Sequence, residues 1–267
     1  MNRTYREYTD YHHEPGGLLR LDLIIDALQE CAGSGAVSEL NVLEIGCGSG
    51  NISRAAASLG CQVLGVDIDA DSIVAAQANN PFPNLRFEIQ DARHLPMSPK
   101  YDAVICSEVF EHLQDPMGLM RTIHNLLKPN KWLLATVPNG YGPEELLRRF
   151  LVTTTPGKKL GRILQKVILI HDTVQTQNWD SPHIQYFSLG RFLALVEKAG
   201  FEVIQVRNWT AFFMQAYYLF LRVVVKRASP LFQRLDAWDR TLAERWPLGL
   251  GGGWFIVARR IAFEGEI

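Results

Sequence analysis

Residues 41–50 read NVLEIGCGSG, an apolar run that leads directly into glycines at Gly46, Gly48 and Gly50. The run is short and continuous, which predicts a buried strand. A helical stretch follows at 51–59 and closes at Gly60. This order places the glycine loop at the carboxyl end of a strand, where α/β sheets bind ligands. Glycine is useful there because a side chain would block the close approach of a ligand to the backbone.

A strand and helix alternation extends from this loop to residue 137 and then resumes near the end of the chain. The apolar runs do not alternate with polar residues, which predicts parallel strands covered on both faces. We expect the last two strands to be neighbours at one sheet edge. The pattern predicts an α/β fold with a doubly wound seven-strand sheet. Its predicted strands are 41–45, 62–66, 85–89, 101–106, 131–137, 201–207 and 254–260, and its predicted helices are 51–59, 69–79, 116–127 and 189–199.

The bulk composition is consistent with one such domain over residues 1–267. The chain is 47% hydrophobic, enough to bury the core of one α/β domain. A formal net charge of -1 argues against binding nucleic acid through bulk electrostatics. The cysteines show no C-x-x-C spacing, and the N-terminus has no apolar signal segment, so we expect a reduced, cytoplasmic protein.

Acidic residues lie at or near the ends of three predicted strands and suggest what the loop binds. Asp67 ends the second strand, where a carboxylate can accept hydrogen bonds from both ribose hydroxyls, and Asp91 follows the third, where it could contact an adenine edge. Glu44 would repel a pyrophosphate but suits the ammonium group of a methionine moiety. A nicotinamide dinucleotide site would require glycine at position 51, which is Asn51. A dehydrogenase remains the rival enzyme, and a simple tight turn remains the rival for the glycines alone.

The stretches VLEIGCGSG, GVDID and IQDARHLP resemble class I S-adenosylmethionine-dependent methyltransferases, over about residues 17–137 and the closing helix and strands. The resemblance implies a Rossmann-like methyltransferase fold and S-adenosylmethionine as cofactor. It also implies which residues bind that cofactor. These are Gly46, Cys47, Gly48, Gly50, Asp67, Ile68, Asp91, Ala92 and Ser107, beside Glu44.

Residues 106–116, CSEVFEHLQDP, are similar to the branch that contains the ubiquinone-biosynthesis O-methyltransferases. The segments HEPGGLLRL at 13–21 and HIQYF at 183–187 also resemble that branch, which implies that Arg20 contacts the cofactor. Residues 209–252 depart from it, so the quinone acceptor is not carried over. The resemblance therefore implies methylation of an oxygen, and we expect the acceptor to be a small or lipid-like metabolite.

Glu111, His112 and His183 are the predicted catalytic residues. If a helix begins at Glu108, then Glu108, Glu111 and His112 can project together. They could bind a hard divalent cation such as Mg²⁺ that acidifies an acceptor hydroxyl, with His183 completing the site. His112 could instead act alone as a base, or pack under the cofactor. A scaffold that binds the cofactor without transferring anything is the non-catalytic rival, and these residues speak against it.

Residues 139–187 and 209–252 interrupt the alternation and are predicted to be helical insertions that form a cap over the acceptor pocket. Each contains a stripe with basic and apolar residues, at 157–172 and 211–227. The two stripes either pack on each other or lie in an anionic membrane interface, which would add a peripheral membrane location.

Overall fold

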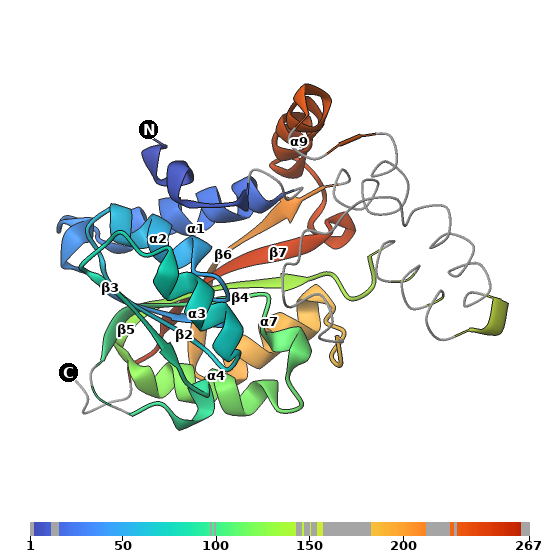
Figure 1. Ribbon diagram of the computed structural model, residues 1–267. Coiled ribbons are helices and arrows are strands. Elements are labelled where there is room, and N and C mark those ends of the chain that lie inside the picture. Colours follow the sequence, from blue (N-terminus) through green and yellow to red (C-terminus); the bar gives the residue numbers. More distant parts are fainter. Residues whose placement is uncertain are drawn as a thin grey trace.

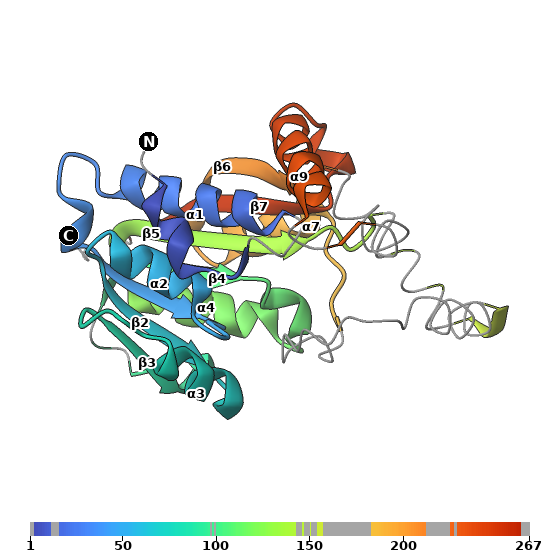
Figure 2. The same ribbon diagram turned by 45° about the horizontal axis from the view of Figure 1, so that its top comes forward.

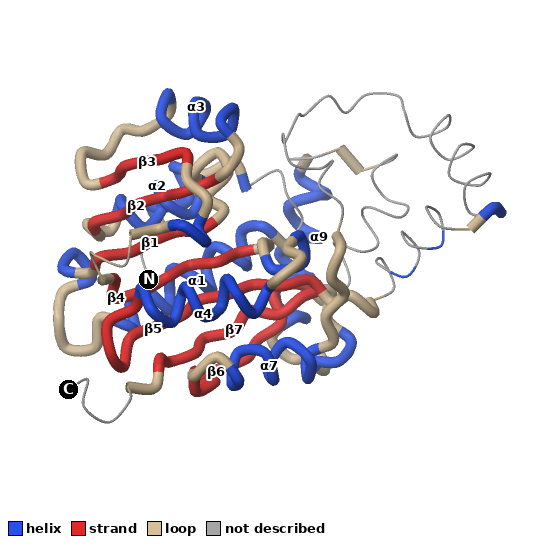
Figure 3. The backbone as a smooth tube through the Cα atoms, turned by 90° about the horizontal axis from the view of Figure 1, so that it is seen from below, coloured by secondary structure: helices blue, strands red, loops and turns tan. Residues whose placement is uncertain are grey.

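The computed structural model describes residues 3–11, 16–96, 98, 100–142, 146, 150, 154–156, 183–211, 225–226 and 229–262. These residues contain one seven-stranded sheet with the strand order β3-β2-β1-β4-β5-β7-β6, which can be followed from one edge to the other in Figure 3. The strands are β1 (Asn41–Ile45), β2 (Gln62–Asp67), β3 (Leu85–Ile89), β4 (Tyr101–Ser107), β5 (Leu127–Pro138), β6 (Phe201–Thr210) and β7 (Gly253–Arg260).

The predicted seven-strand sheet is confirmed. Strands β1 to β5 pair in parallel, whereas β7 pairs antiparallel with both β5 and β6. The expectation that the last two strands are neighbours at one edge is also confirmed. The fifth strand is longer than predicted, because Leu127 already pairs with Tyr101 before the register shifts and pairing resumes at Trp132.

Helices cover both faces of the sheet (Figure 1, Figure 2). Side chains of α1 (Gly17–Cys31), α2 (Asn51–Ser58) and α3 (Ala70–Ala78) share one hydrophobic core. Side chains of α4 (Pro116–Leu126) and α7 (Leu189–Lys198) belong to the core on the opposite face. This arrangement explains why the central strands β1 and β4 are mostly apolar and buried.

The helices begin where local chemistry favours a start. Asp69, Asp115 and Ser188 each accept a hydrogen bond from a backbone N–H in the first turn of α3, α4 and α7. Ser229 does the same for α9 (Pro230–Ala243), whose first helical position is a proline. The sequence pattern did not predict α1, although Leu21, Ile24, Ile25 and Leu28 form its fully buried stripe. Short 3₁₀ turns complete the fold: η1 (Thr4–Tyr8), η3 (Val37–Glu39), η4 (Ala92–His94), η5 (Phe110–His112) and η7 (Leu248–Leu250).

The two predicted insertions are described only in part. Helix α9 and turn η7 show that 209–252 contains helical structure of its own. The stripe at 157–172 lies outside the described residues, as does 211–227 apart from Ala211, Val225 and Lys226. The cap and the membrane contact therefore stay predictions. Among the described residues, no helix combines the length and the hydropathy that crossing a bilayer requires.

Candidate functional site

The strand order brings the predicted cofactor residues together at the carboxyl ends of the parallel strands. Asp91 follows β3, Asp67 ends β2, the glycine loop follows β1, and Ser107 ends β4. Because β3, β2, β1 and β4 are consecutive parallel neighbours, their carboxyl ends form a row in that order. The predicted ligand-binding edge is thus a continuous band across four strands.

Glycine is required at the three loop positions for different structural reasons. All three have positive φ angles, of 72° at Gly46, 50° at Gly48 and 83° at Gly50. A side chain at Gly46 would overlap Val109, and one at Gly50 would overlap the ring of Phe87. At Gly48 a Cβ would meet no atom within 4 Å, because it would project into open space. Internal packing therefore requires glycine at Gly46 and Gly50, whereas Gly48 is the position whose outer side is open.

The carboxylate of Asp67 is directed toward the glycine loop. Its Oδ2 accepts a hydrogen bond from the N–H of Gly48 at 2.8 Å, and its Oδ1 accepts one from the N–H of Asp69 at 2.9 Å. The next residue, Ile68, leaves 74% of its surface exposed. A carboxylate and an exposed apolar side chain are thus adjacent at the end of β2, as sugar and base recognition require.

Glu44 lies beneath the loop, on β1, and is only 2% exposed. The hydroxyl of Ser53 donates a hydrogen bond to its carboxylate. Burial raises the pKa of Glu44 to about 8, and the Asp67 charge adds to the increase. Glu44 is therefore mostly protonated at neutral pH in the ligand-free protein, and a cation placed nearby would favour its ionised form.

Asp91 carries an ionised carboxylate that is already engaged. It caps η4 by accepting from the N–H of Arg93 at 2.9 Å, and the Arg93 guanidinium approaches it at 2.6 Å. Hydrogen bonding to Arg93 lowers the pKa of Asp91 to about 2, despite a smaller opposing effect of burial. The neighbouring Ala92 is buried. An adenine amino group at Asp91 would share the carboxylate with Arg93.

Arg20 sits near the end of β4 in a setting that the sequence did not reveal. Its guanidinium carbon is 5.0 Å from the ring centre of Tyr11 and 5.1 Å from that of Trp209. One of its nitrogens lies 4.0 Å from Oε2 of Glu108. Tyr11 and Trp209 are far apart in the sequence, so no local pattern could have identified them as partners of Arg20.

The expectation that Glu108, Glu111 and His112 project together from one helix is wrong. Glu108 has a φ of 57°, in the left-handed region, and the 3₁₀ turn η5 begins only at Phe110. The side chain of Glu108 accepts a hydrogen bond from Thr136 at 3.0 Å, and the Thr136 hydroxyl lies 2.8 Å from that of Ser107. The left-handed residue separates Glu108 from the side chains that follow it.

Glu111, His112 and His183 do come together. One potential ligand atom from each lies within 4.8 Å of the others. The rings of His112 and His183 are 5.0 Å apart, and Nε2 of His112 is 3.7 Å from a carboxylate oxygen of Glu111. The N–H groups of Ile184 and Gln185 donate to the backbone carbonyl of Glu111, each at 2.9 Å, which brings His183 to η5.

A mixed seven-stranded sheet of this order, with a glycine loop after β1 and a carboxylate at the end of β2, defines a Rossmann-like fold. Residues 16–206 match the family model described as the methyltransferase domain, and the chain belongs to this family.

Proteins that are similar to this chain in sequence and in fold are also methyltransferases. The ubiquinone biosynthesis O-methyltransferase of Leptothrix cholodnii is 33% identical over 110 residues, covering 39% of this chain and 47% of that protein. That of Yersinia pestis is 28% identical over 195 residues, covering 65% and 76%. The chain thus spans about half the length of the Leptothrix relative. An S-adenosylmethionine dependent methyltransferase from Mesorhizobium loti has the same fold, with a TM-score of 0.54 at 17% identity, covering 91% of this chain and 98% of that one.

Proposed function

We propose that this protein transfers the methyl group of S-adenosylmethionine to an oxygen atom of a small or lipid-like acceptor. The observation that carries the proposal is the pairing of Asp67 with the N–H of Gly48, at the glycine whose outer side is open. This geometry leaves room for an adenosyl group against the loop and a carboxylate for its sugar. A nicotinamide dinucleotide has poorer support, since the loop carries Asn51 where such a site requires glycine.

The proposed cofactor lies across the ends of β2, β1 and β4. Asp67, Ile68 and Asp91 hold the adenosine, because they lie on the β2 and β3 side. The methionine arm extends toward β4, where Arg20 receives its carboxylate and Ser107 borders it. A guanidinium matches a carboxylate in charge and shape, and this carboxylate is the anionic group of the cofactor. Glu44 supports the ammonium group from beneath the loop.

The acceptor lies beside η5 in this proposal. Methyl transfer from a sulfonium is an in-line displacement, so the site mainly aligns the acceptor and excludes water. A hydroxyl attacks better once its proton has left, and His112 is the base that removes it. The Glu111 carboxylate, 3.7 Å from the His112 ring, stabilises the resulting imidazolium. The choice of oxygen is supported by the names of the relatives in Leptothrix and Yersinia.

The same residues could alternatively bind a divalent cation. Without Glu108, the cluster offers two imidazoles and one carboxylate, from His112, His183 and Glu111. Imidazole suits zinc or iron better than Mg²⁺, which prefers oxygen ligands. The donor set therefore fits a first-row transition metal and disfavours Mg²⁺. Such an ion would supply acidification of the acceptor hydroxyl.

Apolar side chains support a lipid-like acceptor. Asn139 follows β5, and its side-chain amide donates to the carbonyl of Gly251 at 2.9 Å, which fastens the residues after η7 to the end of β5. Leu248 and Leu250 of η7 and Tyr141 after β5 are all exposed. These three apolar side chains are exposed on segments that follow β5 and precede β7, and they are available to a lipid-like acceptor in this proposal.

The test is an acceptor screen with labelled methyl donor, run on the wild-type protein and on His112→Gln. We expect His112→Gln to lower turnover about 10² to 10⁴-fold, because general base catalysis contributes that much, and to leave affinity for S-adenosylhomocysteine unchanged. Titration with reduced nicotinamide cofactor serves as the control for the dehydrogenase. Equal turnover of His112→Gln would remove the base assignment, and absence of S-adenosylhomocysteine binding by the wild type would overturn the proposed function.

A further inference from the structure

Helix α9 fastens two chain segments that lie beside Arg20. Its buried acidic side chains, Asp236 and Asp239, are 4% and 1% exposed. Asp236 accepts a hydrogen bond from the N–H of Gly16 at 2.8 Å, and Asp239 accepts one from the N–H of Ala211 at 3.1 Å. Gly16 immediately precedes α1, and Ala211 immediately follows β6. One helix therefore sets the position of both segments.

Gly16 connects this attachment to Arg20 and to Trp209. The N–H of Arg20 donates to the carbonyl of Gly16 at 2.9 Å, one helical turn away. Gly16 has a φ of 72°, and a Cβ there would stand 3.1 Å from the Trp209 ring. The ring of Trp209 can thus lie against the chain just before α1, where it reaches the guanidinium of Arg20. A shift of Gly16 would move Arg20 and its stacking partner relative to each other.

Two aromatic rings and one carboxylate surround the guanidinium of Arg20. Its side chain is 12% exposed, and its guanidinium carbon lies over the rings of both Tyr11 and Trp209. The Glu108 carboxylate, at 4.0 Å, lies beyond direct hydrogen-bond distance. A planar cation held in this way is suited to receive a carboxylate.

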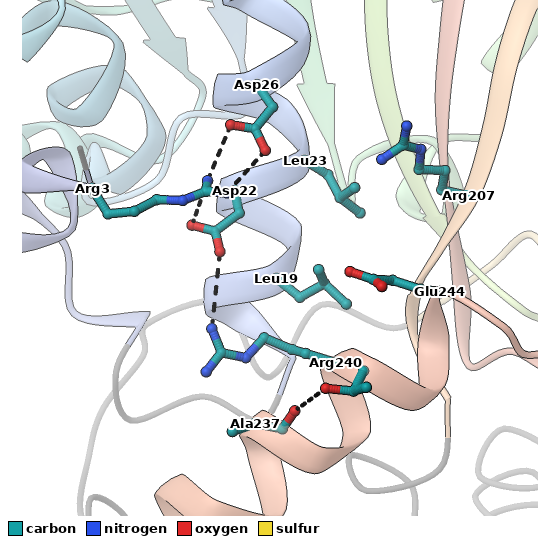
Figure 4. Close-up of a pocket in the computed structure, with 10 residues that line it drawn as sticks. Arg3, Leu19, Asp22, Leu23, Asp26, Arg207, Ala237, Arg240 and Glu244 are labelled. Atoms are coloured by element: carbon teal, nitrogen blue, oxygen red, sulfur yellow. Dashed lines mark hydrogen bonds and ion pairs between the residues drawn. The ribbon is translucent and has the colours of Figure 1, made fainter. Parts of the chain in front are cut away.

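Ion pairs fix α9 against α1 on the same side of the molecule (Figure 4). Arg240 lies 3.9 Å from a carboxylate oxygen of Asp22 on α1 and 3.4 Å from one of Asp236. Arg3 bridges Asp22 at 3.2 Å and Asp26 at 3.1 Å. A cleft of about 350 Å³ opens beside these pairs. Of these pairs, the one between Arg240 and Asp22 joins α9 to α1, the helix that Gly16 precedes.

We infer that Asp236 and Trp209 are positioning residues that aim Arg20 at the carboxylate of the cofactor's methionine arm, which rests on the proposed function. Residues 209–252, which depart from the ubiquinone-biosynthesis branch, thereby contribute to the cofactor site through the end of β6 and through α9. The adenosine half of the cofactor does not depend on them, since it lies toward β2 and β3.

Calorimetry with two probes tests whether Asp236 affects recognition of the methionine arm and not of the adenosine. S-adenosylhomocysteine carries the amino-acid arm, whereas methylthioadenosine lacks it. We expect Asp236→Asn to raise the Kd of S-adenosylhomocysteine about five- to tenfold, because a displaced Arg20 would lose one charge-assisted hydrogen bond to the ligand carboxylate. The Kd of methylthioadenosine should change less than twofold. Glu244→Gln, which makes the same charge change at the exposed residue directly after α9, is the matched control and should bind both probes like the wild type.

A double-mutant cycle with Arg20→Gln shows whether Asp236 acts through Arg20. We expect the double variant to bind S-adenosylhomocysteine no more weakly than Arg20→Gln alone. As a second measure, Trp209→Phe should retain affinity that Trp209→Leu loses. Additive effects, or equal weakening of both probes, would overturn the positioning role while leaving the proposed function intact. A wild-type protein that bound neither probe would instead overturn the proposed function.

Discussion

At the scale of single residues, burial determines the behaviour of the acidic groups at the site. Asp67 ends β2 with both oxygens accepting backbone N–H groups, whereas Glu44 is enclosed under the loop with a hydroxyl partner. Asp91 lies farther out and pairs with Arg93. The pKa is raised for Glu44 and lowered for Asp91, and the three carboxylates differ in their freedom to accept new hydrogen bonds.

Replacing Asp67 with alanine should weaken binding of S-adenosylhomocysteine by about 2 to 3 kcal/mol, because two hydrogen bonds to ribose would be lost. The protein should remain folded, since the residue is at a strand end. Calorimetry measures the affinity and a thermal melt checks the fold. Asp71→Ala, an exposed acid on α3, is the matched control. Unchanged affinity of Asp67→Ala would show that the carboxylate does not hold the sugar.

The raised pKa of Glu44 predicts two opposite pH dependences. Between its ordinary value of 4.5 and about 8, the folded ligand-free protein retains a proton that the unfolded chain has lost. The contribution of Glu44 to stability therefore falls as pH rises through this window. Binding of an ammonium group favours the ionised form, so cofactor affinity should rise with pH over the same range and binding should release a proton.

Calorimetry of S-adenosylhomocysteine binding in two buffers of different ionisation enthalpy measures that proton release. Glu44→Gln should abolish it, and Glu88→Gln, at an exposed position of β3, should not. Identical proton release from the wild type and Glu44→Gln would place the titrating group elsewhere and remove Glu44 from the ammonium site.

At the scale of elements, the loop between β1 and α2 combines two tasks. Gly46 and Gly50 let the loop pack against Val109 and Phe87, while Gly48 leaves its outer side open. The end of β4 makes a comparable sharp change, where left-handed Glu108 turns the chain into η5. Both turns lie at the same sheet edge, so the shape of the site depends on the connections that follow the strands.

Alanine substitutions should separate the two tasks of the glycine loop. Gly48→Ala should cost about 1 kcal/mol of stability, for a side chain in a left-handed conformation, and should greatly reduce S-adenosylhomocysteine binding. Gly50→Ala should lower the melting temperature more, because its Cβ would overlap Phe87. Thermal melts without ligand and calorimetry distinguish the two. A Gly48→Ala protein that bound the ligand normally would show that the open side of the loop is not the ligand side.

At the scale of the whole molecule, the sheet divides the site into a cofactor side and an acceptor side. The row from β3 to β4 carries the glycine loop and the acids, and η5 with His183 lies toward β5. Helix α9 then closes the structure by joining the N-terminal residues to the chain that follows β6. Segments from both ends of the sequence thus meet at one edge of the sheet.

Liposome flotation decides between the two interpretations of the stripes at 157–172 and 211–227. We expect the protein to stay in solution with neutral and with anionic liposomes, because apolar helical stripes usually pack in a core. Charge reversal of Lys158 and Lys159 should then have no effect on flotation. Flotation with anionic liposomes alone, abolished by that charge reversal, would instead establish the membrane contact.

Local patterns in the sequence determined much of the fold. The β-branched runs and the caps at Asp69, Asp115 and Ser188 are short-range features, so the strands and helices from β1 to α4 were predictable within a few residues. The row of Asp67, Asp91 and the glycine loop also followed, because each lies at the end of a predicted parallel strand. Helix α1 was not predicted, and the prediction that Glu108, Glu111 and His112 project from one helix was wrong.

Only the tertiary structure decided which distant residues meet. The pairing of His183 with His112 depends on backbone hydrogen bonds from residues 184 and 185 to Glu111. The stacking of Arg20 between Tyr11 and Trp209 depends on α9 holding Gly16. The sequence by itself determined the elements and the cofactor loop, because propensity, patterning and capping act within a few residues. Contacts across long stretches of chain depend on how the elements pack, and no local pattern records them.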